Sequence, residues 1–275
     1  MGIRINTNIA SINTQRHLMN ATKAFAKSME KLSSGLRITR AGDDAAGLAI
    51  SESLKADIRA LNQASRNASD GISMLQTAEG SMDEVSNILQ RMKELAMQSL
   101  NGTLGDTERG YLNQEYTALI EEMDRIAATT EFNGLRMLDG SGGIVGIQVG
   151  ITNMAQDRID VDLSQSHTAA DLGIVNTIGT VAEAQLAMGE IDVAIQNVVA
   201  ARGAWGAVQN RLESTIRNIS MTAENLSAAN SRIRDVDVAY ETSRMTSYQI
   251  LQQAGISMLS QANLVPGLAL SLLVS

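Results

Sequence analysis

The chain has 275 residues and a formal net charge of -8. This acidic balance argues against broad nucleic-acid binding, which needs a basic face, and against a polybasic membrane anchor. Cysteine is absent, which excludes disulfides and thiolate metal sites, and aromatic residues make up only 3% of the chain. The core must therefore use aliphatic residues, alanine and methionine, which suit long helices packed side by side.

The first residues carry no targeting signal of the common kinds. They lack the apolar run of about 7–15 residues that marks a secretory signal peptide. The longest apolar stretch, Leu264 to Val274, is shorter than the roughly 20 residues that span a bilayer, and it contains Pro266. We therefore expect no membrane span, and export by a route that reads another signal stays open.

Two helices are predicted in the first hundred residues. Apolar residues three and four apart predict the first, over about residues 5–32. Asp43 and Asp44 offer N-caps for a second, which should end near Ser99, before Asn101 and Gly102. This second helix has an apolar residue at every seventh position, the pattern of a coiled-coil seam. Its members are Leu54, Leu61, Ala68, Leu75, Met82, Leu89 and Ala96.

The middle of the chain changes character after a third predicted helix, which covers residues 106–127. Between residues 131 and 177 glycines are frequent. Residues 144–149 are rich in β-branched side chains, and residues 158–163 alternate polar and apolar. We expect a small β-hairpin region here.

A second long seam follows. Thr180 and Glu183 form a capping box that opens a helix. Apolar residues then recur every seven positions, at Ile191, Val198, Trp205, Leu212, Ile219, Leu226, Ile233 and Tyr240. Two long seams separated by a small segment should fold back and pair antiparallel. The predicted fold is mainly α, a long antiparallel helical bundle with a small β-hairpin region and with the N- and C-termini paired.

The two terminal segments are too small and too apolar to stand alone. Residues 1–40 and 240–275 are marginal for an independent core, and residues 245–275 would expose much apolar surface. Either the termini pair only with each other, or several chains share them. We favour the second interpretation, because identical subunits joined head to tail build open helical filaments.

Several motifs resemble those of bacterial flagellins. They include Leu32-Ser33-Ser34-Gly35-Leu36-Arg37, Gly42-Asp43-Asp44-Ala45-Ala46-Gly47, Gln90-Arg91-Met92-Lys93-Glu94-Leu95-Ala96, Glu131-Phe132-Asn133-Gly134, Ile233-Arg234-Asp235-Val236-Asp237 and Gln261-Ala262-Asn263. The resemblance covers nearly the whole chain. It implies a structural subunit of the flagellar filament, secreted by the type III flagellar apparatus, that acts as a helical propeller for swimming.

The resemblance also implies a domain organisation. Residues 1–44 with 236–275 would form a discontinuous coiled-coil domain in the filament core, and residues 45–235 a helical rod with the hairpin. Only about residues 170–179 separate the hairpin from the last helix, so no outer variable domain is expected. Filament-core packing is expected at Ile5, Ile9, Ile12, Tyr240, Ile250, Leu251, Leu270 and Leu272.

The partners implied by the resemblance are further copies of the chain, an export chaperone on the C-terminal segment, a filament cap and hook-junction proteins. Toll-like receptor 5 recognises many flagellins, and the matching positions here are Gln90, Arg91, Leu95 and Glu115. The alternative to a filament subunit is a hook–filament junction protein of the same architecture. The alternative to receptor binding is a solvated helix face with filament contacts.

Nothing in the sequence indicates an enzyme, a cofactor or a metal site. The two histidines, His17 and His167, are expected on the surface or at an interface, and neither belongs to a recognisable ligand cluster. Asp160 and Asp162 share one strand face, for which a solvated surface is the simpler interpretation.

Overall fold

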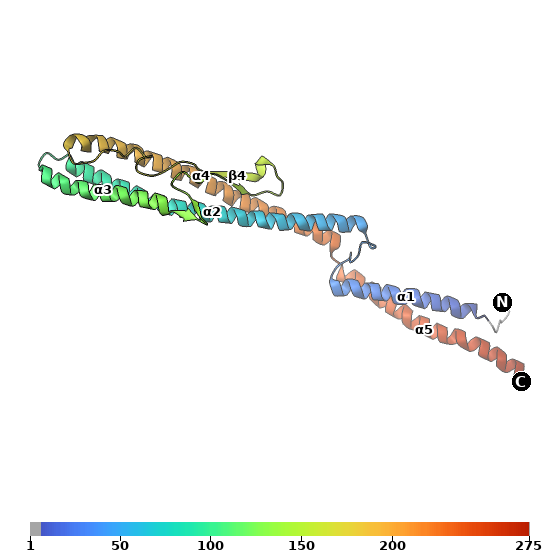
Figure 1. Cartoon of the computed structure of the whole chain (residues 1–275). Coiled ribbons are helices and arrows are strands. Elements are labelled where there is room, and N and C mark those ends of the chain that lie inside the picture. Colours follow the sequence, from blue (N-terminus) through green and yellow to red (C-terminus); the bar gives the residue numbers. More distant parts are fainter. Residues whose placement is uncertain (1–6, 275) are drawn as a thin grey trace. The chain divides into compact units, whose positions relative to one another are not determined.

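A computed structural model of the chain describes residues 7–274, with side chains for residues 7–264 (Figure 1). The helices are α1 (Ile9–Ser34), α2 (Ala45–Ser99), α3 (Asp106–Thr129), α4 (Val181–Arg234) and α5 (Val238–Val274). The strands are β1 (Glu131–Phe132), β2 (Leu135–Arg136), β3 (Gly143–Gln148) and β4 (Arg158–Leu163), with a short 3-10 turn at Ala155–Asp157. The predicted fold class, mainly helical with a small hairpin region, is confirmed.

The chain forms two compact units. One comprises Met1–Ala56 and Asn225–Ser275, and the other Asp57–Glu224. We call them the terminal unit and the central unit. Their boundaries fall inside α2 and α4, whereas the sequence-based division at residues 44 and 236 follows the breaks between helices. The division into filament domains stays a prediction, because compact units within one copy do not show how an assembly is partitioned.

Side-chain caps set the starts of the long helices. Asp44 Oδ1 accepts a hydrogen bond from the Gly47 N–H at 2.9 Å and caps α2 as predicted. Asp43 does not cap the helix, which corrects that prediction. Its carboxylate pairs with Lys27 at 2.6 Å and accepts hydrogen bonds from Thr39. The bond from Lys27, supported by those from Thr39, holds the pKa of Asp43 well below its usual value.

The capping box before α4 is confirmed. Thr180 Oγ1 accepts from the Glu183 N–H at 3.3 Å, and the Glu183 carboxylate accepts from the Thr180 N–H at 3.1 Å. These reciprocal bonds satisfy two N–H groups that the first turn of a helix leaves free.

The two predicted seams form the core of the central unit. Three polar contacts show that α2 and α4 run antiparallel there, since the residue number rises on one helix as it falls on the other. They are Lys93–Asp192, Asp83–Arg202 and Glu79–Gln209. All predicted seam residues of the central unit are 0–7% exposed, namely Leu61, Ala68, Leu75, Met82, Leu89, Ala96, Ile191, Val198, Trp205, Leu212 and Ile219.

The hairpins complete this core. β3 and β4 pair antiparallel, with Gly143 opposite Leu163 and Gln148 opposite Arg158. The inward residues of β4 alternate with exposed ones as predicted, and Asp160 and Asp162 lie on the exposed face. A tight turn joins β1 to β2 at Asn133 and Gly134, both of which have positive φ.

Strand β3 of the hairpin packs closely against α2 at Gly71. A Cβ at Gly71 would lie 2.3 Å from Ile147 Cδ1, so the missing side chain makes room for β3. Gly71→Ala is expected to displace the buried Ile147, at a cost of roughly 1–3 kcal/mol that exceeds the gain of up to about 1 kcal/mol in helix propensity. Urea unfolding measures the net change.

Gly80 provides the matched control on the same helix. No atom lies within 4 Å of a Cβ placed there, so Gly80→Ala should stabilise the monomer by about 0.5–1 kcal/mol. Equal changes in the free energy of unfolding for Gly71→Ala and Gly80→Ala would show that Ile147 of β3 does not limit the space for a side chain at position 71.

The second seam ends earlier than predicted. We expected the heptad series to continue to Tyr240, but α4 ends at Arg234 and Tyr240 is 63% exposed. The backbone leaves the helix because the Val236 N–H donates to Gly35 O at 3.0 Å and the Arg37 N–H donates to Arg234 O at 2.6 Å. Asp237 then caps α5 by accepting from the Tyr240 N–H at 3.0 Å.

Candidate assembly and recognition surfaces

The terminal unit is built around the antiparallel pair of α1 and α5. At one end Asn8 Nδ2 donates to Ala262 O at 2.7 Å. At the other end Ser28 Oγ donates to Glu241 Oε1 at 2.5 Å. The start of α1 and the far part of α5 therefore lie together, as the prediction of paired termini requires.

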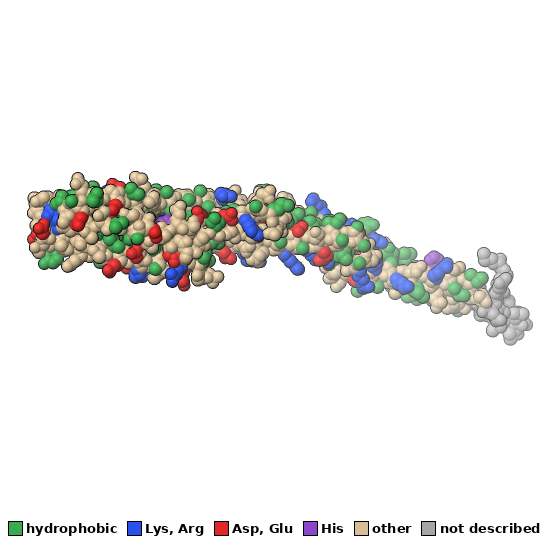
Figure 2. All heavy atoms as spheres, turned by 45° about the horizontal axis from the view of Figure 1, so that its top comes forward, with side chains coloured by type: hydrophobic (Ala, Val, Ile, Leu, Met, Phe, Trp, Pro, Cys, Tyr) green, Lys and Arg blue, Asp and Glu red, His purple; other side chains and the backbone are tan. Residues whose placement is uncertain are grey.

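This helix pair has almost no apolar interior of its own. Over residues 9–34 and 238–264, the only fully buried side chains are Ser28 and Glu241, which are polar. Figure 2 shows apolar side chains on the surface of the pair. Those more than half exposed are Ile9, Ile12, Met19, Met29, Val238, Tyr240, Ile250, Leu251, Ile256, Met258 and Leu264.

An apolar groove runs between the two helices. It has a volume of about 580 Å³ and is lined mainly by Leu18, Ala21, Ala24, Leu251, Ala254 and Met258. Beside it, the guanidinium of Arg244 lies 5.7 Å from the ring centroids of both Tyr240 and Tyr248. Tyrosine and arginine are frequent anchors of protein–protein interfaces, so this stack and the groove are suited to hold another polypeptide.

The predicted filament-core residues fall mostly on this surface. Ile9, Ile12, Tyr240, Ile250 and Leu251 are all exposed in the single copy. Ile5 lies outside the described residues, and so do the side chains of Leu270 and Leu272. Their role in filament packing stays a prediction.

A second surface lies where α3 packs beside α2. Arg91 Nε and Nη2 donate to Glu115 Oε1 at 3.0 and 2.8 Å, and Nη1 donates to Glu94 at 2.9 Å. The side chains of Arg91 and Glu115 are about half exposed, and Gln90 is exposed beside them. The hydrogen bonds that Arg91 donates to Glu94 and Glu115 raise the pKa of Arg91.

Leu95, the fourth position matched to receptor binding, is 0% exposed. It belongs to the core between the helices and cannot touch a partner in this conformation. The sequence brings Gln90, Arg91 and Glu115 to one accessible face, and Leu95 supports that face from beneath.

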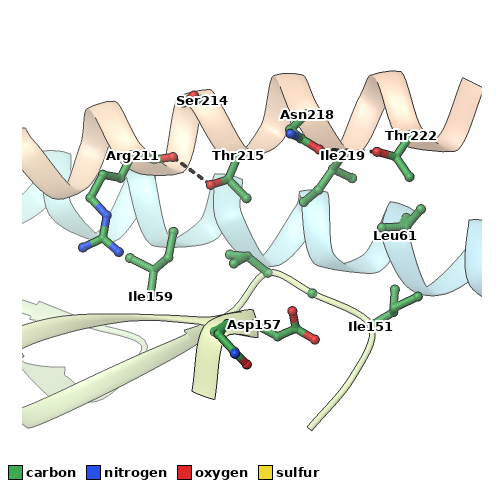
Figure 3. Close-up of a pocket in the computed structure, with 13 residues that line it drawn as sticks. Leu61, Ile151, Asp157, Ile159, Arg211, Ser214, Thr215, Asn218, Ile219 and Thr222 are labelled. Carbon is green, nitrogen blue, oxygen red and sulfur yellow. Dashed lines mark hydrogen bonds between the residues drawn. The ribbon is translucent and has the colours of Figure 1, made fainter. Parts of the chain in front are cut away.

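A third surface was not anticipated from the sequence. The loop between β3 and β4 overhangs α4 and α2 and leaves a groove of about 630 Å³ (Figure 3). Ile151, Ile159, Ile219 and Leu61 give it an apolar wall, while Arg211, Asn218 and Thr222 give it a polar one. Asp157 keeps the loop in shape by accepting hydrogen bonds from the N–H and hydroxyl of Thr152.

Two kinds of feature, a metal site and a membrane-spanning helix, are not found among the described residues. Among them there is no group of three histidine, cysteine or carboxylate side chains that could hold a metal ion. Within the same part of the chain, no helix is long and apolar enough to cross a membrane.

His17 is exposed as expected, but His167 is only 3% exposed, so its predicted surface position is wrong. It is buried because its ring packs against Trp205.

Comparison with known proteins covers nearly the whole chain. The family model for the bacterial flagellin N-terminal helical region matches residues 5–142, and that for the C-terminal helical region matches residues 188–273. A flagellin of Halalkalibacterium halodurans is 49% identical over 272 residues, covering 98% of this chain and 99% of the relative. A flagellin of Bacillus subtilis is 44% identical over 305 residues, covering 98% and 100%.

A solved structure agrees with the fold. The crystal structure of Bacillus cereus flagellin is 32% identical, with a TM-score of 0.51, and the match covers 60% of this chain and 94% of that one.

Proposed function

Because this chain belongs to the bacterial flagellin family, whose members are structural subunits of the flagellar filament, we propose that copies of it polymerise into a long, smooth filament through α1 and α5. Flagellins are exported to the extracellular filament and are not enzymes, and the same holds for this chain. The observation that carries the proposal is the helix pair whose apolar side chains face outward.

A single copy of the chain leaves apolar surface of α1 and α5 exposed. In the described parts of α1 and α5 the exposed large apolar side chains outnumber the buried ones, so a single copy leaves these side chains in water. Burying such surface stabilises an assembly by about 25 cal/mol per Å². Further copies of the same helix pair can cover these side chains, because heterologous contacts between identical chains build an open helical filament whenever their rotation does not close into a ring.

Sedimentation tests this proposal and separates it from the junction-protein alternative. Purified chain seeded with short filament fragments should enter the pellet above a critical concentration, and the pelleted amount should grow linearly with added protein. A junction protein would stop at small oligomers and stay in the supernatant. High identity to flagellins over nearly the full length supports the filament subunit.

The propeller role needs a filament that is curved, and so a subunit contact with two packings. We place this contact at the groove beneath the β3–β4 loop, where apolar and polar walls meet. Small shifts of the loop against α4 would change the length of a row of subunits and bend the filament.

The partners follow from the same surfaces. An export chaperone would cover the apolar face of α5 before assembly, since that face is otherwise exposed to water. The filament cap and the hook-junction proteins would engage the terminal helices at the two ends of the filament, where no further copy covers them.

We also propose that the monomer is recognised by Toll-like receptor 5 through Gln90, Arg91 and Glu115. Two carboxylates hold the Arg91 guanidinium in place, which reduces the entropy that a partner must remove on binding. Arg91→Ala is expected to lower receptor activation at least about tenfold, the range of an interface arginine.

Reporter cells exposed to purified monomer provide the measurement for this prediction. Arg66→Ala, the same substitution on an exposed part of α2, is the matched control, because the Arg66 guanidinium donates hydrogen bonds to Gln63 of its own helix. Unchanged activation by Arg91→Ala, with circular dichroism showing a folded chain, would remove Arg91 from the recognition surface.

A further inference from the structure

His167 lies in the segment that follows β4 and joins three parts of the central unit. Its ring centroid is 5.9 Å from that of Trp205 on α4. Its backbone N–H donates to Leu138 O at 2.8 Å, beyond β2. Two residues later the Ala169 N–H donates to Asp124 on α3 at 2.7 Å. The burial of one imidazole therefore fixes this segment against its neighbours.

The ring lies between an apolar wall from α4 and a polar wall that contains Asp160, Asp162 and Gln165. A cavity of about 170 Å³ lies beside the two rings, and its α4 wall contains Ala201, Ala204 and Val208, none of which titrates. The Trp205 Nε1–H donates to Asp162 O at 3.4 Å. Charged groups on the elements packed around His167 include Asp160 and Asp162 on β4, Asp139 with its partner Arg136, Asp124 on α3, Arg202 on α4 with its partner Asp83, and Asp171 in the same segment.

The folded chain disfavours the protonated, charged form of the His167 imidazole. Its Nδ1 is buried and has no hydrogen-bond partner among the described residues. Protonation would place a positive charge on the ring and leave an unsatisfied N–H donor at this buried nitrogen. Burial lowers the pKa of His167, although a hydrogen bond with the Gln165 backbone opposes this effect.

We propose that His167 is an acid-released latch, whose neutral ring fastens the segment after β4, and with it the β3–β4 hairpin, to α4. The unfolded chain takes up this proton near pH 6.5, whereas the folded chain takes it up only at lower pH. The contribution of the latch to stability is therefore complete above pH 6.5 and is lost as the pH falls toward the folded-state pKa.

The carboxylates near His167 do not remove the predicted pH dependence of stability. Asp160 and Asp162 lie on the water-exposed face of β4, where solvent weakens their attraction to an imidazolium. Hydrogen bonds from Ser164 hold the pKa of Asp162 below its usual value, so it stays charged through the window in which His167 titrates.

The test compares the full-length monomer with His167→Gln and His17→Gln, at low salt and from about pH 5 to pH 8. Between pH 6.5 and the folded-state pKa, the folded-to-unfolded ratio of the wild type should fall by up to about tenfold per pH unit more than that of His167→Gln. His17→Gln, which changes the other histidine, should follow the wild type. Trp205 is the single tryptophan. Its fluorescence in the folded chain should fall with a midpoint at the folded-state pKa of His167, because an adjacent imidazolium quenches indole emission.

Proton NMR measures the titration of the two histidines directly in the folded wild-type chain, so this part of the test does not depend on whether a variant folds. A His167 resonance that titrates below pH 6.5 in the folded wild type supports the latch. A resonance that titrates at or above that value would overturn it, as would identical pH dependence of unfolding in the wild type and His167→Gln.

Discussion

Ile250→Asp is expected to abolish filament growth while leaving the monomer folded. Ile250 is 61% exposed on α5, so its replacement removes little that holds a single copy together. In the assembly the change loses the burial of an isoleucine, about 1.5–3 kcal/mol, and adds a carboxylate whose desolvation costs several kcal/mol more. At 1.4 kcal/mol per factor of ten, the critical concentration should rise at least about a hundredfold.

Ile250→Leu is the matched control, because it keeps the apolar volume and should pellet at close to the wild-type concentration. Circular dichroism and urea unfolding of both variants should match the wild type. Assembly of Ile250→Asp at the wild-type critical concentration would show that this face of α5 stays in water within the filament.

Leu89→Ala is expected to destabilise the monomer by about 2–5 kcal/mol, a loss typical of a fully buried leucine. Leu89 is 0% exposed and belongs to the α2 seam, which packs against α4 and the hairpins. The replacement leaves a cavity that rigid helix backbones cannot close. Urea unfolding followed by Trp205 fluorescence measures the change, since Trp205 lies in the same core.

Met97→Ala on the same helix is the control for Leu89→Ala. Met97 is 54% exposed, so its truncation should alter the free energy of unfolding by no more than about 0.5 kcal/mol. Similar losses at the two positions would mean that the heptad seam is not what holds the central unit together.

The sequence predicts the helices of the central unit well because their burial repeats every seven residues. Leu75, Met82 and Leu89 are each 0% exposed, and the pattern can be read without knowing what lies opposite. The capping residues Asp44 and Thr180 are equally local signals, since each bonds a backbone N–H three residues ahead.

What the sequence does not predict depends on contacts between distant segments. The seam stops before Tyr240 because residues 234–236 bond to residues 35–37, which no periodicity reveals. His167 is buried because Trp205, 38 positions later in the chain, packs on it. The groove beneath the β3–β4 loop likewise arises only when that loop meets α4. The exposed apolar side chains of α5 are the converse case: they can be seen in the sequence, but nothing in the single copy covers them.

Helical reconstruction of the filament by electron cryomicroscopy tests the central claim most directly. The account predicts long, smooth filaments in which Ile9, Ile12, Ile250 and Leu251 are buried between α1 and α5 of neighbouring copies. Filaments in which these four side chains face water, with contacts made by the central unit alone, would contradict it.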